Sequence, residues 1–433
     1  MRVRTLACAL ASAGLLAALA RPAAAAPGSL DPSFGTNGIV RTDLTPKGDT
    51  AYAVAVQPDG RIVAAGSAAN SATFAVVRYL RDGALDPSFG NGGVVRTDFG
   101  PYQDAAYAVA IQSDGDIVAA GVEGANRPNS SIALARYLPD GTPDPAFGTG
   151  GKVTTPVSPK DDEADGVRIE SGGDIVVAGG AGLNGTNPDF VVLRYTPDGV
   201  LDPSFGTKGI VRTDFGGDSF DWAIGGLVVQ PNGDIVAGGY SIRVSSPSDG
   251  RFALARYLPG GNLDPSFGND GLVTTNFTTH TDYISGLALD GSDIVAVGEA
   301  GTRSSRDTAA LARYTPAGKL DPTFGTGGTV TTDYGPFGDA AAAVAIDPST
   351  QDLVTAGAIG LGGPNPKFAV CRYTPAGKLD PTFGKGGEVF SDLGPSDDHA
   401  NAVAIQPSGR IIAAGVARSG SGNSKFALAG YES

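Results

Sequence analysis

The sequence contains very little cysteine and histidine. Its 433 residues include two Cys and two His. Cys8 lies in the apolar N-terminal stretch, so Cys371 alone remains in the rest of the chain, and we expect no disulfide within it. His280 and His399 provide little for a metal site or for acid–base catalysis. Stability is therefore expected to come from a hydrophobic core.

Positive charge and long apolar runs are also scarce. The chain has 31 Lys and Arg against 45 Asp and Glu, a net charge of −14, and its basic residues stand singly. Binding to phosphate backbones needs clustered Lys and Arg, so we expect no nucleic-acid partner. After residue 25 no segment approaches the roughly 18 consecutive apolar residues of a membrane-spanning helix, and we expect no transmembrane segment.

The N-terminus has the pattern of a secretory leader. Arg2 and Arg4 precede an apolar stretch from Leu6 to Ala20, and small residues follow up to Ala25. This order predicts a signal peptide over residues 1–25 that is removed during export. We therefore expect a secreted or periplasmic protein.

A tandem repeat dominates residues 26–433. The motif Asp-Pro-x-Phe-Gly occurs in seven copies, which begin at Asp31, Asp86, Asp144, Asp202, Asp264, Asp321 and Asp380. Each copy contains four short segments rich in Val, Ile and Ala and bounded by Gly, Pro and Asp, which predict β-strands. We name them A (51–57 in the first copy), B (61–67), C (74–80) and D (the Asp-Pro motif through 38–44).

Seven such copies are compatible with a closed β-propeller or an open β-solenoid. Residues 26–433 begin with a D segment and end after a C segment, as expected if the first strand completes the last blade. A solenoid would carry polar capping units at both ends. We therefore predict an all-β, single-domain, monomeric seven-bladed β-propeller with four strands per blade, closed by the N-terminal strand.

The repeat also resembles a known group. The motifs LDPSFG, VAVQPDGRIVAAG and FALARY followed by PDG resemble those of bacterial proteins that carry the delta-60 repeat, a β-propeller family of unknown function. Pro143 and Gly430 depart from this pattern. The resemblance implies export in bacteria and, by analogy with other propellers, a binding or scaffold role.

Residues that recur in every blade are expected to serve the fold. The phenylalanine of the Asp-Pro motif and a tyrosine that ends segment C recur in all seven copies, and both are expected to pack in and between blades. An arginine precedes that tyrosine in six copies: Arg78, Arg136, Arg194, Arg256, Arg313 and Arg372. We predict that it lies between blades and bonds a recurring aspartate.

A second aspartate series lies in the connections from D to A. Its members are Asp49, Asp104, Asp162, Asp221, Asp282, Asp339 and Asp398. These carboxylates form a candidate ligand or cation face at the channel mouth, with Ca²⁺ as the candidate ion and no other cofactor expected. The alternative is that each one caps its own turn.

Three further features break the symmetry of the repeat. Trp222 could stack on a sugar ring or pack between blades. His280 and His399 both fall in D-to-A connections. Asp161, Glu163 and Asp165 have the alternating spacing of a calcium loop, without its glutamate at the twelfth position, and form either a local calcium site or a solvated acidic turn.

The functional expectation is a binding or scaffold module. Its face would carry the D-to-A connections and the variable, polar B-to-C loops, and its partner would be a protein, glycan or surface polymer. The alternative is a hydrolase or lyase that acts at the channel mouth with Asp282, His280, Asp398 and His399, which requires the two histidines to converge.

Overall fold

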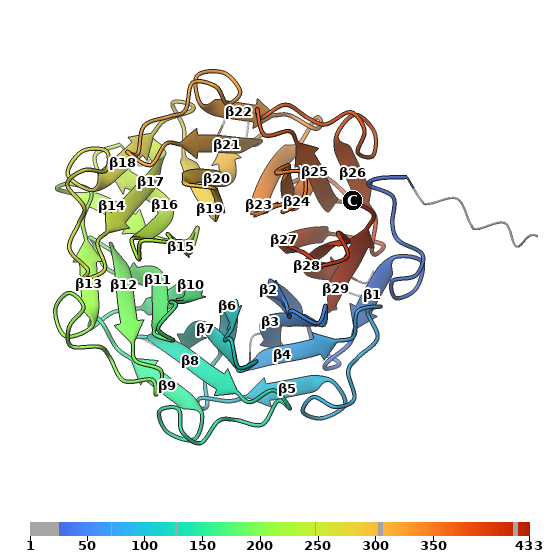
Figure 1. Ribbon diagram of the computed structural model, residues 1–433, viewed down its shortest axis with the longest axis horizontal. Coiled ribbons are helices and arrows are strands. Elements are labelled where there is room, and N and C mark those ends of the chain that lie inside the picture. The colour runs from blue at the N-terminus through green and yellow to red at the C-terminus, as the bar shows by residue number, and fades with distance from the viewer. Residues whose placement is uncertain (1–25, 71, 126–128, 247, 302–305, 419–422) are drawn as a thin grey trace, which may run out of the picture.

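The computed structural model describes residues 26–70, 72–125, 129–246, 248–301, 306–418 and 423–433, so the expected signal peptide lies outside it. Seven antiparallel sheets radiate around a central channel (Figure 1). Six of them have four strands. The sheet formed by residues 219–275 has five, because its inner strand is divided in two. The predicted seven-bladed propeller is confirmed.

The strands follow the repeat closely. Blades 1 to 3 consist of β2 (Thr50–Val56), β3 (Ile62–Ala68), β4 (Thr73–Tyr79) and β5 (Val94–Thr97); β6 (Asp104–Ile111), β7 (Ile117–Glu123), β8 (Ser131–Tyr137) and β9 (Lys152–Thr155); and β10 (Asp162–Ile169), β11 (Ile175–Ala181), β12 (Asp189–Tyr195) and β13 (Ile210–Thr213). Blades 4 and 5 consist of β14 (Ser219–Trp222), β15 (Leu227–Val229), β16 (Ile235–Arg243), β17 (Gly250–Tyr257) and β18 (Leu272–Thr275); and β19 (Asp282–Asp290), β20 (Asp293–Ala300), β21 (Thr308–Tyr314) and β22 (Thr329–Thr332). Blades 6 and 7 consist of β23 (Gly338–Ile346), β24 (Leu353–Leu361), β25 (Lys367–Tyr373) and β26 (Glu388–Ser391); and β27 (Asp398–Ile405), β28 (Ile411–Arg418), β29 (Ser424–Tyr431) and β1 (Ile39–Thr42).

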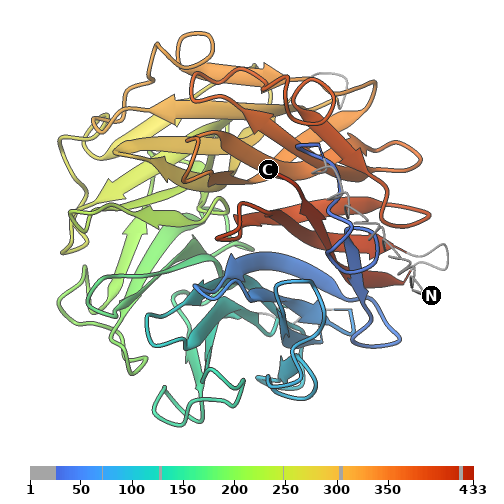
Figure 2. The same ribbon diagram turned by 45° about the vertical axis from the view of Figure 1, so that its right-hand side comes forward.

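The ring closes by pairing the two ends of the described chain. Strand β1 pairs antiparallel with β29, with Ile39 opposite Ala429 and Thr42 opposite Phe426. In Figures 1 and 2 the blue first strand lies beside the red last strands. Strand β1 thus completes the seventh blade by pairing with the outer edge of β29, as the order of segments predicted.

The recurring tyrosine links each blade to the one before it. In blade 1, the hydroxyls of Tyr79 and Thr42 lie 2.9 Å apart, and Thr42 belongs to the outer strand of blade 7. Each of the other six tyrosines has the same contact with a Thr or Ser of the preceding blade. All seven tyrosines and all seven phenylalanines of the Asp-Pro motifs are buried. The predicted packing role of both aromatic series is therefore confirmed.

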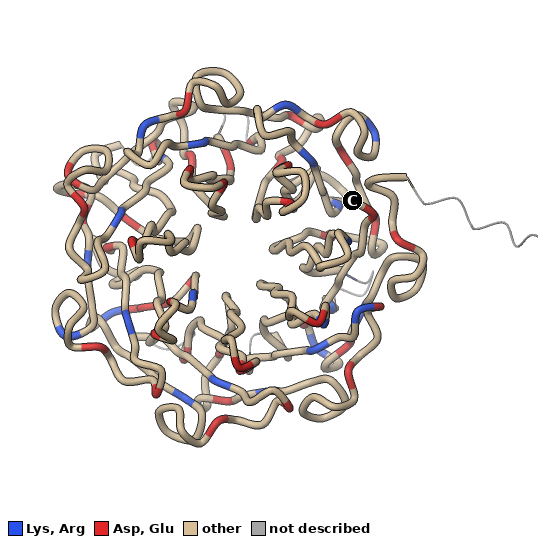
Figure 3. Tube along the Cα trace, in the orientation of Figure 1, with Lys and Arg blue, Asp and Glu red and all other residues tan. Residues whose placement is uncertain are grey.

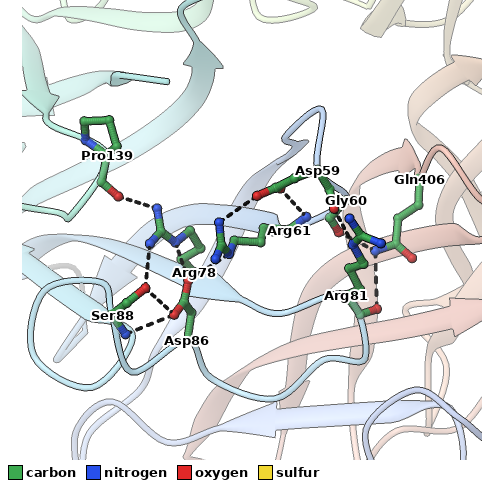
Figure 4. Close-up of polar contacts among 9 residues, drawn as sticks. All are labelled: Asp59, Gly60, Arg61, Arg78, Arg81, Asp86, Ser88, Pro139 and Gln406. Atoms are coloured by element: carbon green, nitrogen blue, oxygen red, sulfur yellow. Dashed lines mark hydrogen bonds and ion pairs between the residues drawn. The ribbon is translucent and has the colours of Figure 1, made fainter. Parts of the chain in front are cut away.

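The recurring arginine forms a clamp with three partners. Figure 4 shows it in blade 1, where Arg78 Nε donates to Asp86 Oδ2 at 2.8 Å and Nη1 donates to the carbonyl of Pro139 in the next blade. The guanidinium also stacks over Phe89, 4.6 Å from the ring centre. Charge-assisted bonds of this type satisfy a buried guanidinium. The predicted inter-blade arginine–aspartate pair is thus present.

The same clamp recurs around the ring. The six arginines lie with Nε 2.7–2.9 Å from the aspartate of their own Asp-Pro motif. They stack 4.5–4.9 Å from the following phenylalanine. Burial alone would raise the pKa of Asp86, but the bonds from Ser88 and the charge of Arg78 hold that pKa below its usual value.

Blade 7 lacks the arginine and replaces it from another strand. Gly430 occupies the arginine position, and Arg410, which precedes β28, donates to Asp31 Oδ2 at 2.5 Å. Arg410 also stacks over Phe34 and donates to the carbonyl of Arg81 in blade 1, at 2.7 Å. The clamp at the closing blade is therefore rebuilt by a residue one strand away.

The described residues contain strands, turns and loops but no helix, and accordingly no helix long and apolar enough to cross a membrane. Lys and Arg are dispersed around the ring rather than gathered in one sector (Figure 3). Among the described residues, Lys and Arg thus form no single basic sector, and the absence of a nucleic-acid partner stays a prediction.

We expect Arg410→Ala to lower the free energy of unfolding by about 2 to 4 kcal/mol, because it leaves the buried Asp31 carboxylate without its cation. The matched control is Arg61→Ala: Arg61 occupies the same position in blade 1, 3.2 Å from Asp86, but Asp86 keeps Arg78. The control substitution should lower the free energy of unfolding by less than about 1 kcal/mol. If chemical denaturation shows that the two variants lose the same free energy of unfolding, Arg410 does not replace the missing arginine of the clamp.

Candidate functional site

The inner strands line the central channel through a β-bulge. In six blades the register of the inner strand shifts by one residue, for example between Ala51 and Ala53 in β2, so that Tyr52 is left unpaired. In blade 4 the interval between β14 and β15 takes the place of the bulge. Bulges re-aim side chains, here into the channel. The residues at this position are Tyr52, Tyr107, Asp165, Ile224, Ser285, Ala342 and Asn401, which all line a central cavity of about 170 Å³.

The bulge explains a glycine that every B segment contains. It lies opposite the bulge in all seven blades, for example Gly66 in β3 and Gly179 in β11. A Cβ on Gly66 would lie 1.9 Å from the carbonyl oxygen of Thr50, and one on Gly179 would lie 2.0 Å from that of Glu163. The repeat therefore conserves the residue that permits the bulge while leaving the bulged residue free to vary.

A second variable position begins each inner strand. It lies directly after the aspartate of the D-to-A connection and holds Thr50, Ala105, Glu163, Trp222, Tyr283, Ala340 and His399. Blades 3 to 5 place acidic and aromatic residues there, whereas blade 6 places alanine at both variable positions. One side of the channel mouth is thus lined by acidic and aromatic groups and another side by methyl groups.

Trp222 connects blades 3 and 4. Its indole Nε1 donates to Asp165 Oδ2 at 2.7 Å, and its ring lies over Gly180 of β11, where a Cβ would come within 2.9 Å of the indole. The equivalent position in the neighbouring blade holds Tyr240, so glycine at 180 makes room for the indole. Trp222 is half-buried. It therefore packs between blades and still reaches the channel mouth.

Glu163 and Asp165 lie together without a cation beside them. Burial raises the pKa of Asp165 to about 7, although the bond from Trp222 opposes the shift. Burial, and then the charges of Asp165 and Asp161, raise the pKa of Glu163 well above its usual value. Within the described residues, Glu163 has no hydrogen-bond or ion-pair partner. Burial therefore favours the protonated form of both carboxyls.

Tyrosine rings border this pair on both sides. Tyr107 of β6 is close enough to Glu163 and Asp165 for both to raise its pKa, after burial itself, and its ring meets Tyr52 edge to face at 5.1 Å. On the other side, Tyr240 lies 6.2 Å from Trp222 between ring centres. Both tyrosines are half-buried. The acidic pair thus lies between aromatic residues of blades 2 and 4.

The arrangement continues into blade 5. Tyr283 of β19 lies 6.3 Å from Tyr240 in an edge-to-face contact, and Glu299 stands opposite Tyr283 in β20. Burial raises the pKa of Glu299 to about 7, although the hydroxyl of Tyr283 bonds it. We name the whole set the aromatic arc; it comprises Tyr107, Glu163, Asp165, Trp222, Tyr240, Tyr283 and Glu299.

The D-to-A aspartates lie behind this surface. Each is at most 1% exposed. Asp162 is typical, because its carboxylate accepts the amides of Val157 at 2.7 Å, Ser158 at 2.8 Å and Gly182 at 3.0 Å. Burial raises the pKa of Asp339 to about 6, while the amides of Tyr334 and Gly360 oppose the shift. These are turn-capping contacts, and a cation role for the series stays a prediction.

The same contacts place two sets of loops on one face. The amide of Asn70, after β3, donates to the carbonyl of Gly48 before β2, and Leu183 donates likewise to Asp161. The B-to-C loops therefore border the D-to-A connections, as expected. Residues 71, 126–128, 247, 302–305 and 419–422 of those loops lie outside the described part of the chain.

The two histidines are not brought together. His280 lies in the loop before β19 and contacts Thr279, whereas His399 begins β27 and contacts Asp397. Blade 6 separates their two blades. Burial lowers the pKa of His399, and Asp397 opposes that shift. Asp282 and Asp398 are buried in their turns, so these four residues do not form a joint site.

The three acidic residues with the spacing of a calcium loop have two different roles. Asp161 accepts the amides of Asn129 and Ser130, both at 3.0 Å, while Glu163 and Asp165 belong to the aromatic arc. No group of three His, Cys, Asp or Glu among the described residues is placed to hold a metal ion. Calcium binding therefore stays a prediction.

Sequence reasoning identified Trp222, Glu163 and Asp165 but missed Tyr107, Tyr240, Tyr283 and Glu299. A signal for them is present in the repeat. When the seven copies are superposed, the two variable positions of segment A and the residue after the B-segment glycine differ in residue type between blades, although they lie within strands whose neighbouring positions repeat. Variation at a fixed position of a repeat marks residues that the blade itself does not require.

Six segments match one family model. Its description is "Domain of unknown function (DUF5122) beta-propeller", and the matched segments are residues 57–89, 112–147, 173–205, 230–267, 292–324 and 353–383. Each DUF5122 segment spans strands B and C and the Asp-Pro motif of one of blades 1 to 6. The seventh copy is divided between the two ends of the chain and is not matched. A search of curated proteins gives no match.

Solved structures with the same fold are distant in sequence. An ulvan lyase of polysaccharide lyase family PL25 is 10% identical with a TM-score of 0.50, covering 91% of this chain and 96% of its own. A catalytically inactive virginiamycin B lyase from Staphylococcus aureus is 13% identical with a TM-score of 0.49, covering 90% and 98%. A protein of unknown function from Dyadobacter fermentans is 12% identical with a TM-score of 0.48, covering 91% and 99%. Such low identities show the fold alone.

We expect Asp165→Asn to stabilise the protein at pH 8 and to change little at pH 4. The folded-state pKa of about 7 exceeds the unfolded value of about 3.9, so the folded state binds the extra proton between these limits and stability falls as the pH rises through them. Asparagine cannot ionise but still accepts the Trp222 bond. The gain should be about 1 to 3 kcal/mol, measured by denaturation across pH.

The control for this pH dependence is Asp82→Asn in an exposed turn, where asparagine can accept the same amide of Ala84. It removes the same charge and should leave the shape of the stability curve unchanged. Parallel curves for wild type and Asp165→Asn from pH 4 to 8 would show that Asp165 ionises normally in the folded protein.

Proposed function

We propose that the protein is an exported bacterial binding module whose ligand site is the aromatic arc at the channel mouth. The observation that carries this proposal is the convergence of variable positions. Blades with a uniform frame place their divergent residues, Glu163, Asp165, Trp222, Tyr240 and Tyr283, side by side at one end of the channel. Two members of the arc, Tyr107 and Asp165, also line the central cavity, and cavities with aromatic walls and a few polar groups are typical ligand sites.

The proposal extends to the family and the location of the protein. We infer that all seven blades belong to the same group as the six matched segments, and that this group includes the delta-60 repeats. The secretory pattern of residues 1–25 supports export, and the loops that border the channel mouth support contact with a protein, glycan or surface polymer. A monomeric ring leaves this face open to such a partner.

The binding test uses the single tryptophan of the protein, which lies in the proposed site. We expect the emission of Trp222 to change saturably when the protein is titrated with a panel of oligosaccharides, organic cations and soluble surface polymers. Tyr240→Ala should weaken that binding at least about tenfold, since a buried aromatic contact contributes about 1.4 kcal/mol or more.

The matched control is Phe390→Ala on the outer strand β26, where the ring is 39% exposed and remote from the channel. It should leave the affinity unchanged. A ligand that binds in calorimetry without altering Trp222 emission, and that Tyr240→Ala does not weaken, would place the binding site elsewhere on the molecule.

A second candidate function is a hydrolase or lyase acting at the same place. The observation that favours it is the proximity of two carboxyl groups whose pKa values are raised, since carboxyls that ionise near neutral pH serve as general acids and bases. If so, Glu163→Gln should reduce product formation from a polysaccharide panel by about 100-fold or more. Wild-type protein that releases neither reducing ends nor unsaturated products would restrict the site to binding.

A further inference from the structure

We infer that the aromatic arc binds an organic ammonium group. This inference rests on the proposed function and specifies its ligand chemistry. The arc combines two features that such a cation requires: aromatic rings that border the site on several sides, and carboxyl groups that form no ion pair with a described Lys or Arg. Ammonium groups bind over aromatic faces through the ring quadrupole, and adjacent carboxylates add a direct charge interaction.

The aromatic part of the site is formed by four residues from three blades. Tyr107 comes from blade 2, Trp222 and Tyr240 from blade 4 and Tyr283 from blade 5. The ring centres of Trp222 and Tyr240 lie 6.2 Å apart, and those of Tyr240 and Tyr283 lie 6.3 Å apart. All four side chains are half-buried, so their rings are packed but accessible.

The acidic part of the site lacks a counter-ion. Neither Glu163 nor Asp165 forms an ion pair with a described Lys or Arg. Asp165 accepts one bond, from Trp222, through Oδ2, and the carboxyl of Glu163 accepts none. Arg168, the nearest basic residue along β10, lies three positions further along the channel and bonds the carbonyl of Val167. A cationic ligand would supply the charge that the site lacks.

The groups that face the acidic pair also favour a cation. They are Asp161 in the preceding loop, Tyr107 of β6, Trp222 of β14 and Tyr240 of β16. None of these four carries positive charge; Arg168, which lines the same central cavity as Asp165, is the basic residue nearest to the pair along β10. Glu299, in blade 5, extends the negative surface beyond Tyr283. An anionic ligand would therefore meet unfavourable charge on this side of the channel mouth.

Proton binding predicts how the affinity depends on pH. Since burial raises the pKa of both carboxyls, to about 7 for Asp165, a bound ammonium ion favours their ionised forms and releases protons. Affinity should therefore rise between pH 6 and pH 8, and calorimetry in buffers of different ionisation enthalpy should detect proton release. A neutral ligand would not produce this rise.

The experiment compares three ligands of similar size on the full protein: choline, ethanolamine and 3,3-dimethylbutan-1-ol, the neutral isostere of choline. We expect choline or ethanolamine to bind at least about tenfold more tightly than the isostere, measured by calorimetry and by Trp222 emission. The difference in affinity between choline and ethanolamine shows whether the site prefers a quaternary or a primary ammonium group. Equal binding of the isostere, or no binding of either cation, would overturn the inference.

Variants separate the role of charge at the site from net charge. Glu163→Gln with Asp165→Asn should weaken cation binding at least about tenfold and remove its pH dependence. Two matched substitutions, Glu388→Gln on β26 and Asp82→Asn in the exposed turn, remove equal charge far from the channel and should leave the affinity unchanged. Tm measurements on each variant confirm that it is folded.

The outcomes distinguish this inference from the proposed function. If an oligosaccharide changes Trp222 emission and Tyr240→Ala weakens it, while neither cation binds, the arc is a binding site for a neutral ligand and only the ammonium inference fails. If the cations bind, but their binding does not alter Trp222 emission and is not weakened by Tyr240→Ala, the arc is not the site. The proposed function and the ammonium inference then both fail.

Discussion

The guanidinium between neighbouring blades is the contact on which the ring depends. Each one joins the aspartate of its own outer turn and the face of the following phenylalanine, and five of the six also bond a carbonyl of the next blade, as Arg78 does with Asp86, Phe89 and Pro139. A buried guanidinium needs all of these partners, because an unpaired charge in the interior is costly. The closing blade meets the same requirement with Arg410, although its own arginine position holds Gly430.

Because the contacts between blades lie away from the channel, the residues of the inner strands can differ from blade to blade. Packing between blades is supplied by the arginine clamp and by the tyrosine that bonds the preceding blade, and both lie towards the outside of the ring. At the channel, the bulge and its opposing glycine set the backbone, whatever side chain the bulged residue carries. A propeller built in this way can change its channel lining blade by blade without disturbing the ring.

Burying two acidic side chains in the aromatic arc lowers the stability of the protein, and contacts elsewhere in the ring have to offset this loss. Glu163 and Asp165 are held together in a partly buried site with no cation beside them, and burial raises the pKa of both groups. Such an arrangement lowers the stability of the folded state above neutral pH, because folding disfavours the ionised carboxylates. Groups whose pKa is raised by burial in a cavity are characteristic of functional positions. The arginine clamps and the buried aromatic residues keep the ring intact around this site.

The sequence by itself determined the number of blades, the four strands of each, the closure by the first strand and the pairing of the recurring arginine with an aspartate. These features repeat seven or six times, and a repeated pattern of strands and turns leaves few alternatives. The sequence also indicated Trp222, Glu163 and Asp165, because they interrupt the repeat. Only the tertiary structure decided that Asp162 and its equivalents are buried in turns, and that Tyr107, Tyr240 and Tyr283 join the acidic pair. The reason is that these contacts cross from one blade to the next, and a bulge one residue long sets which side chains reach the channel.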